Sequence, residues 1–165
     1  GKVVNDIPAS KRGIGFVFQN YALFRYMTVF DNIAFGLKIQ KKDKKYIKER
    51  VSELVELIGL KGLEKRYPSQ LSGGQQQRTS IGRAIVKNPD ILLCDEPTGA
   101  LDYKTSKDIL KLIETINQKY GNTVIIVTHN DAIKLMADKV IKLRDGNIRK
   151  EYENTEKVNA EELDW

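Results

Sequence analysis

The stretch that decides the fold runs from Leu71 to Asp102 and reads LSGGQQQRTSIGRAIVKNPDILLCDEPTGALD. A helix is predicted over Gly73–Lys87. Two glycines after a serine at a helix start leave free N–H groups and the positive dipole end pointing outward, which suits an anion. The apolar run Ile91–Cys94 ends in Asp95 and Glu96, a pattern that indicates a buried strand with carboxylates at its tip. A phosphate cradle joined by one helix to a pair of acids predicts nucleotide chemistry.

Two more apolar runs place polar groups at strand ends. Thr123–Thr128 predicts a second buried strand, and a helix from Asp102 to Gln118 precedes it. Two buried strands joined by a helix form a βαβ crossover, so a parallel sheet is expected. Ile14–Phe18 predicts a third strand. Gln19 and His129 directly follow their strands, and groups at the carboxyl ends of parallel strands converge on one crevice.

Composition and charge limit the classes of protein to which the chain can belong. The 165 residues suit one domain with a core, and no apolar run reaches the ~18 residues of a membrane span. The single cysteine, Cys94, cannot form an internal disulfide, which favours a reducing compartment. All charged side chains of residues 151–165 are six acids and one lysine, so we expect an acidic, flexible tail.

The remaining helices and loops leave two alternatives open. Lys41–Ile58 predicts an amphipathic helix, and its lysines lack the interleaved aromatics that nucleic-acid binding requires, so no nucleic acid partner is expected. Gly82 inside the earlier helix predicts close packing. The aromatic residues between Gln19 and Leu37 fit either core packing or a docking surface. They are Tyr21, Phe24, Tyr26, Phe30 and Phe35.

The polar groups can be given chemical roles. Asp95 can hold Mg²⁺ directly or through water, and Glu96 can polarise a water for in-line attack. Gln19 can complete the metal or water shell, and His129 can orient the water or contact a phosphate. Ser72–Gly74 can cradle that phosphate. Each part also has a structural reading, because strand-end histidines, Asp-Glu-Pro loops and Gly-Gly turns are common; their joint order is what is specific.

In these motifs the chain resembles the ATP-binding-cassette (ABC) ATPases. The family's signature motif matches Leu71, Ser72, Gly73, Gly74 and Gln75. The Walker B motif matches ILLCDEP at 91–97, with Asp95 and the catalytic Glu96. The D-loop matches Ala100, Leu101 and Asp102. The Q-loop matches Gln19, and the switch histidine matches His129.

The resemblance implies a mechanism. Two such domains, in a homo- or heterodimer, pair head to tail with ATP and Mg²⁺ between them. Residues 71–75 of one subunit then bind the ATP held by the phosphate loop of the other. Glu96, His129 and Gln19 would be catalytic, and Asp95 and Gln19 would hold the metal. Closure would energise transport by permease subunits that dock near Tyr21–Leu37, at the cytoplasmic face of the cell membrane. This implication favours the docking interpretation of the aromatics.

The resemblance also predicts the fold class and its division. We expect an α/β fold with a P-loop NTPase-like parallel sheet, a helical subdomain over about 20–88, a cassette over 1–150 and the tail 151–165. The phosphate loop G-x-x-x-x-G-K-[ST] is absent, so the domain is expected to be incomplete at its N-terminus. The alternatives are a non-catalytic fragment that offers only its signature half-site, and a non-transport ABC ATPase.

The subfamily signals are mixed. Residues 20–37 resemble sulfate, polyamine and sugar importers, whereas the stretch from Asp95 onward resembles lipoprotein-release and macrolide-efflux exporters. The sequence therefore leaves both the substrate and the direction of transport open.

Overall fold

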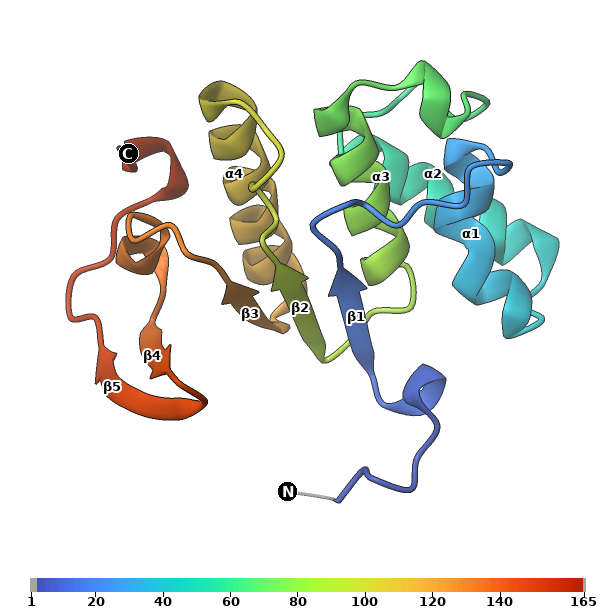
Figure 1. Ribbon diagram of the computed structural model, residues 1–165. Coiled ribbons are helices and arrows are strands. Elements are labelled where there is room, and N and C mark those ends of the chain that lie inside the picture. The colour runs from blue at the N-terminus through green and yellow to red at the C-terminus, as the bar shows by residue number, and fades with distance from the viewer. Residues whose placement is uncertain (1–2, 165) are drawn as a thin grey trace.

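A three-stranded parallel sheet forms the centre of the computed structural model, which describes residues 3–164 (Figure 1). The strands are β1 (Ile14–Val17), β2 (Ile91–Asp95) and β3 (Thr123–Val127), in the order β1-β2-β3. The register pairs Phe16 with Leu93, and Leu93 with Ile125. The predicted parallel sheet is confirmed, and the three strands end at one edge.

Within residues 3–164, four α-helices accompany this sheet. They are α1 (Val29–Ile39), α2 (Lys44–Leu57), α3 (Gly73–Ile85) and α4 (Tyr103–Tyr120). The hairpin strands β4 (Lys139–Arg144) and β5 (Asn147–Glu153) follow, and short 3₁₀ turns lie at residues 9–11, 68–70, 133–136 and 160–162. Asp145 and Gly146 form the hairpin turn with φ values of 51° and 75°, as their Asp-Gly sequence predicts.

Side-chain oxygens begin each α-helix. Thr28, Asp43, Ser72 and Asp102 are the N-caps, and each accepts a hydrogen bond from the backbone N–H three residues later. Such caps satisfy one of the four N–H groups that a helix start leaves without an intrahelical partner. The caps also explain why α2 begins at Lys44, three residues after its predicted start at Lys41.

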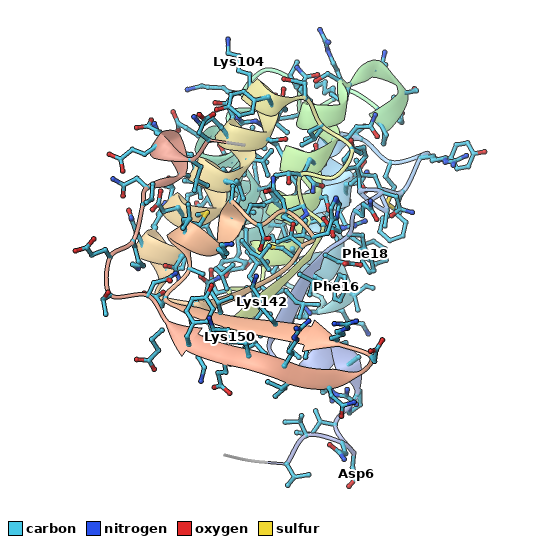
Figure 2. All side chains as sticks on the ribbon, turned by 60° about the vertical axis from the view of Figure 1, so that its left-hand side comes forward. Asp6, Phe16, Phe18, Lys104, Lys142 and Lys150 are labelled. Atoms are coloured by element: carbon cyan, nitrogen blue, oxygen red, sulfur yellow. The ribbon has the colours of Figure 1, made fainter. Side chains whose placement is uncertain are left out.

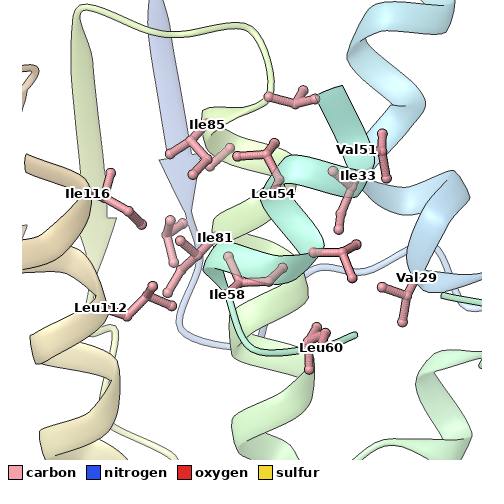
Figure 3. Close-up of a cluster of buried hydrophobic side chains, with 14 of the residues drawn as sticks. Val29, Ile33, Val51, Leu54, Ile58, Leu60, Ile81, Ile85, Leu112 and Ile116 are labelled. Carbon is pink, nitrogen blue, oxygen red and sulfur yellow. The ribbon is translucent and has the colours of Figure 1, made fainter. Parts of the chain in front are cut away.

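One apolar core joins the helices to one face of the sheet (Figure 3). It includes the buried Ile33 of α1, Leu54 of α2, Ile81 of α3 and Ile113 of α4. Gly82 permits this packing as predicted, because a methyl group there would lie 2.9 Å from Ile58 Cδ1. Helices α1, α2 and α3 lie within residues 20–88, for which the helical subdomain stays a prediction.

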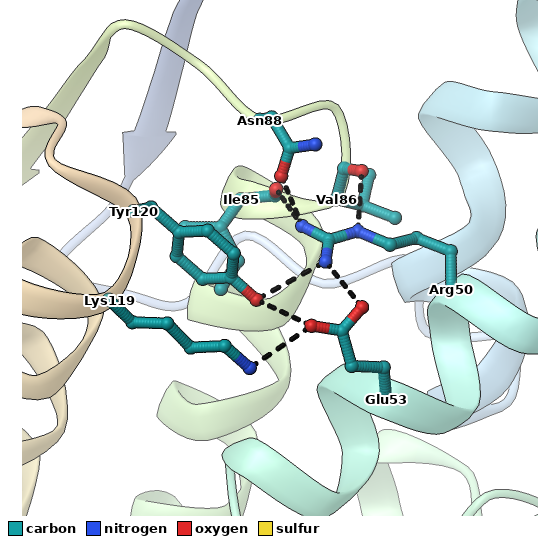
Figure 4. Close-up of polar contacts among 7 residues, drawn as sticks. All are labelled: Arg50, Glu53, Ile85, Val86, Asn88, Lys119 and Tyr120. Carbon is teal, nitrogen blue, oxygen red and sulfur yellow. Dashed lines mark hydrogen bonds and ion pairs between the residues drawn. The ribbon is translucent and has the colours of Figure 1, made fainter.

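A buried arginine ties α2 to α3 and α4 (Figure 4). Arg50 is 8% exposed, and its NH1 group donates to Glu53 at 2.8 Å and to the Tyr120 hydroxyl at 3.2 Å. Its other guanidinium groups donate to oxygens at the end of α3, namely Ile85 O, Val86 O and Asn88 Oδ1. Lys119 adds a further donor to Glu53 at 3.1 Å. These contacts hold the helices together at the end of α3 away from the signature residues.

The second face of the sheet carries exposed apolar side chains. Ile14 and Phe18 of the β1 segment are 42% and 41% exposed, and Ile125 and Val127 of β3 are 42% and 51% exposed. Figure 2 shows Phe16 of β1 and Phe18, which directly follows the strand, on the same side of the chain. Their ring centroids are 4.2 Å apart. In the part of the chain that the structure describes, the core therefore lies on the helical side of the sheet.

The C-terminal segment packs on the body of the protein, unlike the flexible tail that we predicted. Strand β5 continues to Glu153, so the expected boundary at residue 150 falls inside a strand. Ala160 and Leu163 are buried with Leu110 of α4 and Ile133. The prediction was wrong because it relied on the polar average of the segment, whereas two buried apolar residues, Ala160 and Leu163, anchor it.

Candidate functional site

The site is built where β2 and β3 end side by side. Asp95 pairs with Val127 in the sheet, and the backbone N–H of Glu96 donates to Val127 O at 2.8 Å. Glu96 then adopts a φ of 45°, in the left-handed region that non-glycine residues rarely occupy. This turn gives the two adjacent carboxylates different surroundings. Positive φ values of non-glycine residues, like that of Glu96, occur preferentially at functional sites.

The Glu96 carboxylate is held by the residues that follow β3. Its Oε1 lies 2.7 Å from Nδ1 of His129 and accepts the His129 backbone N–H at 2.9 Å. Its Oε2 accepts the Thr128 hydroxyl at 3.3 Å. The Glu96 side chain is 18% exposed and that of His129 is 83% exposed. The pair therefore combines a fixed carboxylate with an imidazole that opens to solvent.

Asp95 fits a magnesium ligand. Among the described residues, no side chain or backbone N–H bonds its carboxylate, which is partly buried at the strand tip. Within the same part of the chain, no three His, Cys, Asp or Glu side chains gather into a complete metal site. This arrangement suits Mg²⁺, which is usually bound by one or two carboxylates together with the phosphates of a substrate.

Gln19 reaches the same strand-end region from β1. A methyl group built on Gly99 would lie 3.1 Å from Gln19 Nε2 and 3.4 Å from Glu96 Cβ. Gly99 therefore lies between the two side chains. The structure thus brings together the groups after all three strands, as the sequence predicted.

The signature residues form the start of α3. Ser72 and Gln75 cap the helix reciprocally, with Ser72 Oγ accepting from Gln75 N at 3.3 Å and Gln75 Oε1 accepting from Ser72 N at 3.0 Å. The N–H groups of Gly73 and Gly74 have no acceptor among the described residues. Leu71 is buried at 8% exposure. Two free amides at a helix N-terminus suit an anion, so this role of the signature residues stays a prediction.

The D-loop joins these parts. Leu101 N donates to Thr98 O at 3.1 Å, and Asp102 caps α4 beyond the exposed Ala100. A methyl group on Gly73 would lie 3.4 Å from Leu101 Cδ2, so the D-loop contacts the signature segment of the same chain.

Two residues of the site went unassigned in the sequence. Gln77 is fully buried in α3 and donates to Pro97 O at 2.6 Å, which links the signature helix to the residue after Glu96. Thr128 supports Glu96 through the hydroxyl contact described above. The sequence signal for Gln77 was a glutamine at an inward position of an amphipathic helix. The signal for Thr128 was its position directly before His129.

The aromatic residues after Gln19 contribute to an open groove of about 330 Å³. Phe24 and Phe35 line it with ring centroids 4.5 Å apart, and Arg83 lies 5.4 Å over the Phe24 ring. Tyr26 is 95% exposed, whereas Phe30 packs against the core. The rest of the lining comes from β1, α3 and the residues that follow each of them, and includes Ile14, Gly15, Phe16, Phe18, Ala84 and Lys87.

Comparisons with known proteins agree with the motifs. The family model described as ABC transporter matches residues 1–99. A sulfate/thiosulfate import ATP-binding protein of Mycobacterium bovis is 44% identical over 161 residues, covering 97% of this chain and 46% of that protein. A spermidine/putrescine import ATP-binding protein of Desulfitobacterium hafniense is 49% identical over 150 residues, covering 90% and 43%. The chain thus spans less than half the length of these relatives.

Solved structures give the same result. The ATP-binding cassette MJ0796, in a dimeric post-hydrolysis state bound to ADP and Pi, matches with a TM-score of 0.78 at 34% identity, over 92% of this chain and 68% of that one. The cassette cbiO1 of Clostridium perfringens matches with a TM-score of 0.79 at 30% identity, over 92% and 59%. None of the helices in residues 3–164 combines the length and apolarity that a membrane crossing requires. By sequence and by structure, the chain belongs to the ABC transporter family.

Proposed function

We propose that this chain is part of the ATP-binding and ATP-hydrolysing subunit of an ABC importer. The observation that carries the proposal is the contact between Glu96 and His129 at the ends of adjacent strands. A carboxylate with one oxygen held by an imidazole and a backbone amide is fixed in place to accept a proton from water. The relatives named above are import ATP-binding proteins, which supports import over export.

The roles of the residues follow from their surroundings. Glu96 is the general base, and His129 orients it and faces the nucleotide from the solvent side. Asp95 and Gln19 hold the metal, because one offers a free carboxylate and the other an amide beside Gly99. Bound Mg²⁺ supplies charge neutralisation on the phosphates of ATP.

A head-to-tail dimer completes the site. The free N–H groups of Gly73 and Gly74 and the Ser72 hydroxyl bind the phosphates of ATP held by a second cassette. This arrangement is supported by the helix start, where the dipole favours an anion, and by the dimeric state of the similar cassette MJ0796. The second cassette is another copy of the protein or a related subunit.

The membrane partner docks in the groove between β1, α1 and α3. Its aromatic lining suits the apolar face of an amphipathic helix, and Arg83 and Lys87 suit an acidic residue on that helix. We infer that permease subunits present this helix at the cytoplasmic face of the cell membrane. The segment that the sequence predicts as the docking site, Tyr21–Leu37, provides only part of the lining of this groove.

The test compares three variants of the full-length protein. Glu96→Gln keeps the size of the side chain and removes its basicity, so ATP hydrolysis should fall by about 10²-fold or more while ATP binding remains. Glu56→Gln is the matched control, because Glu56 is exposed and pairs with the exposed Lys61. His129→Ala should lower hydrolysis as well. Hydrolysis by Glu96→Gln at the rate of the Glu56→Gln control would refute the assignment of the base.

A further inference from the structure

The turn that follows Gln19 is strained and is held from outside. Tyr21 and Ala22 have φ values of 64° and 48°, so two consecutive non-glycine residues occupy the left-handed region. This region is disfavoured for residues with a side chain, because the Cβ atom comes too close to a backbone carbonyl oxygen. A pair of them persists only where the surrounding structure fixes the backbone.

Arg83 of α3 supplies that restraint. Its NH1 group donates to Ala22 O at 2.6 Å, and its NH2 group donates to Tyr21 O at 3.0 Å. Among the described residues, no carboxylate forms an ion pair with Arg83, and burial lowers its pKa. This partly buried cation, which has no acid beside it in the described part of the chain, donates to two carbonyls of one turn and lies over the Phe24 ring.

The same turn touches the opposite end of α3. A methyl group built on Gly73 would lie 3.0 Å from the Tyr21 hydroxyl, so this hydroxyl lies directly over the first signature glycine. The segment after β1 crosses α3 on its way to α1 (Figure 1). Ala22 and Phe24 also line the docking groove. One turn therefore contacts the groove, the signature glycine and an arginine ten residues further along the same helix.

We propose that Tyr21 and Arg83 are positioning residues that transmit occupancy of the docking groove to the amides of Gly73 and Gly74. Because Arg83 fixes both carbonyls of the turn, a partner that presses on Phe24 displaces Tyr21 with it. The hydroxyl then shifts against Gly73 and changes the direction of the amides that face the second cassette. The expected effect on ATP hydrolysis rests on the proposed function. The contacts that join Arg83, Tyr21 and Gly73 lie within this one chain and can be tested without it.

Amide hydrogen exchange in the 165-residue chain tests the link directly. Arg83→Lys retains the charge but cannot hold two carbonyls in the planar arrangement of arginine, and Tyr21→Phe removes only the hydroxyl. Each variant should change exchange at Gly73 and Gly74 by about threefold or more, and the double variant should differ from the sum of the two effects because they act in series.

The matched control is Arg78→Lys. Arg78 lies on the same helix and also donates to a backbone carbonyl, Ile58 O at 3.0 Å, but it does not hydrogen-bond the turn. Tyr46→Phe on α2 controls for loss of a hydroxyl. Equal exchange at Gly73 in Arg83→Lys and Arg78→Lys would overturn the proposal. Melting temperatures of all variants identify any general loss of structure, and Arg83→Gln, which retains one donor group, then serves as the second test.

Activity of the full-length protein gives the functional readout. Arg83→Lys should lower kcat about tenfold, because two charge-assisted hydrogen bonds are weakened, and should leave the ATP affinity of the separate subunit within twofold. A loss of ATP affinity with kcat unchanged would contradict the proposal. An inactive unsubstituted protein would instead refute the proposed function, whereas altered exchange at Gly73 would still establish the link.

Discussion

Glu96 and His129 meet across the ends of β2 and β3, with Glu96 Oε1 2.7 Å from His129 Nδ1. The two residues are far apart in the sequence, and the parallel pairing of Asp95 with Val127 sets their distance. The contact leaves the outer side of the imidazole open to solvent. A second molecule can therefore approach this pair without displacement of the core.

The first prediction concerns dimerisation of the full-length protein. Glu96→Gln should accumulate an ATP-bound closed dimer, because nucleotide still binds but the water loses its base. Ser72→Arg should prevent the dimer, since bulk would enter the space where the partner's phosphates approach the N-terminus of α3. Size-exclusion chromatography with ATP separates the two outcomes. A Glu96→Gln protein that stays monomeric at saturating ATP would argue against the head-to-tail arrangement.

The second prediction concerns stability at low pH. Burial alone would raise the pKa of Glu53, but hydrogen bonds from Arg50, Lys119 and Tyr120 outweigh it and lower the pKa to about 2. A carboxyl with a lowered folded-state pKa stabilises the protein above its unfolded value of about 4.3, and this stabilisation is lost as the pH falls towards 2. Because the Glu53 side chain is 45% exposed, we expect only roughly 1 kcal/mol.

Urea unfolding of the 165-residue chain at pH 5 and pH 2.5 measures this effect. The free energy of unfolding should fall less between these pH values in Glu53→Gln than in the unsubstituted chain. Glu56→Gln is the control, since its pair with Lys61 is exposed on both sides and should add little. Parallel pH profiles for Glu53→Gln and the unsubstituted chain would mean that the contacts in Figure 4 do not bind the ionised carboxylate.

The third prediction concerns the C-terminal segment. Leu163 is 1% exposed against Leu110 and Ile133, so Leu163→Ala should lower the free energy of unfolding by about 2–3 kcal/mol. Leu143→Ala is the matched control, because Leu143 is 71% exposed and should change stability by less than about 0.5 kcal/mol. Equal urea midpoints for Leu163→Ala and Leu143→Ala would favour the flexible tail that was predicted from composition.

The sequence predicted those features that depend on local pattern and strand order. The strand that ends at Asp95, the strand that precedes His129 and the helix with Gly82 at a crowded position could be predicted directly, because apolar runs and turn residues fix them. The shared edge of the parallel sheet then brought Gln19 and Glu96 together. Family resemblance added the head-to-tail mechanism, which no single chain contains.

The features that escaped prediction depend on contacts between distant segments. The burial of Leu163 requires Leu110, and the buried state of Arg50 requires carbonyls at the end of α3. The left-handed turn at Tyr21 and Ala22 carries no glycine, so its conformation is set by Arg83, about sixty residues further along the chain. Local propensity has no access to such restraints.

The last prediction concerns the second signature glycine. A methyl group built on Gly74 would lie 2.6 Å from Cγ2 of Thr105. Thr105 cannot easily rotate away, because its hydroxyl donates to Asp102 Oδ2 at 2.6 Å while its backbone N–H donates to Asp102 Oδ1 at 3.0 Å. The capped start of α4 therefore requires glycine at position 74 of α3.

Two opposing effects decide the outcome of Gly74→Ala. Replacing a helical glycine by alanine gains up to about 1 kcal/mol, whereas overpacking destabilises by about 1–3 kcal/mol. We expect the second effect to dominate, so Gly74→Ala should destabilise the chain. Thr105→Ser removes only the methyl group and keeps the hydroxyl, and in that background Gly74→Ala should be neutral or stabilising.

Urea unfolding of the four proteins in this double-mutant cycle gives the coupling energy, which we expect to be about 1–3 kcal/mol. Gly36→Ala is the matched control for a helical glycine, because a methyl group there meets only the flexible end of Lys87 at 3.3 Å and should stabilise α1. A coupling energy near zero would mean that α3 and α4 do not contact each other through Gly74 and Thr105. The proposed approach of a phosphate to the Gly74 N–H group would then be the remaining reason to exclude a side chain at this position.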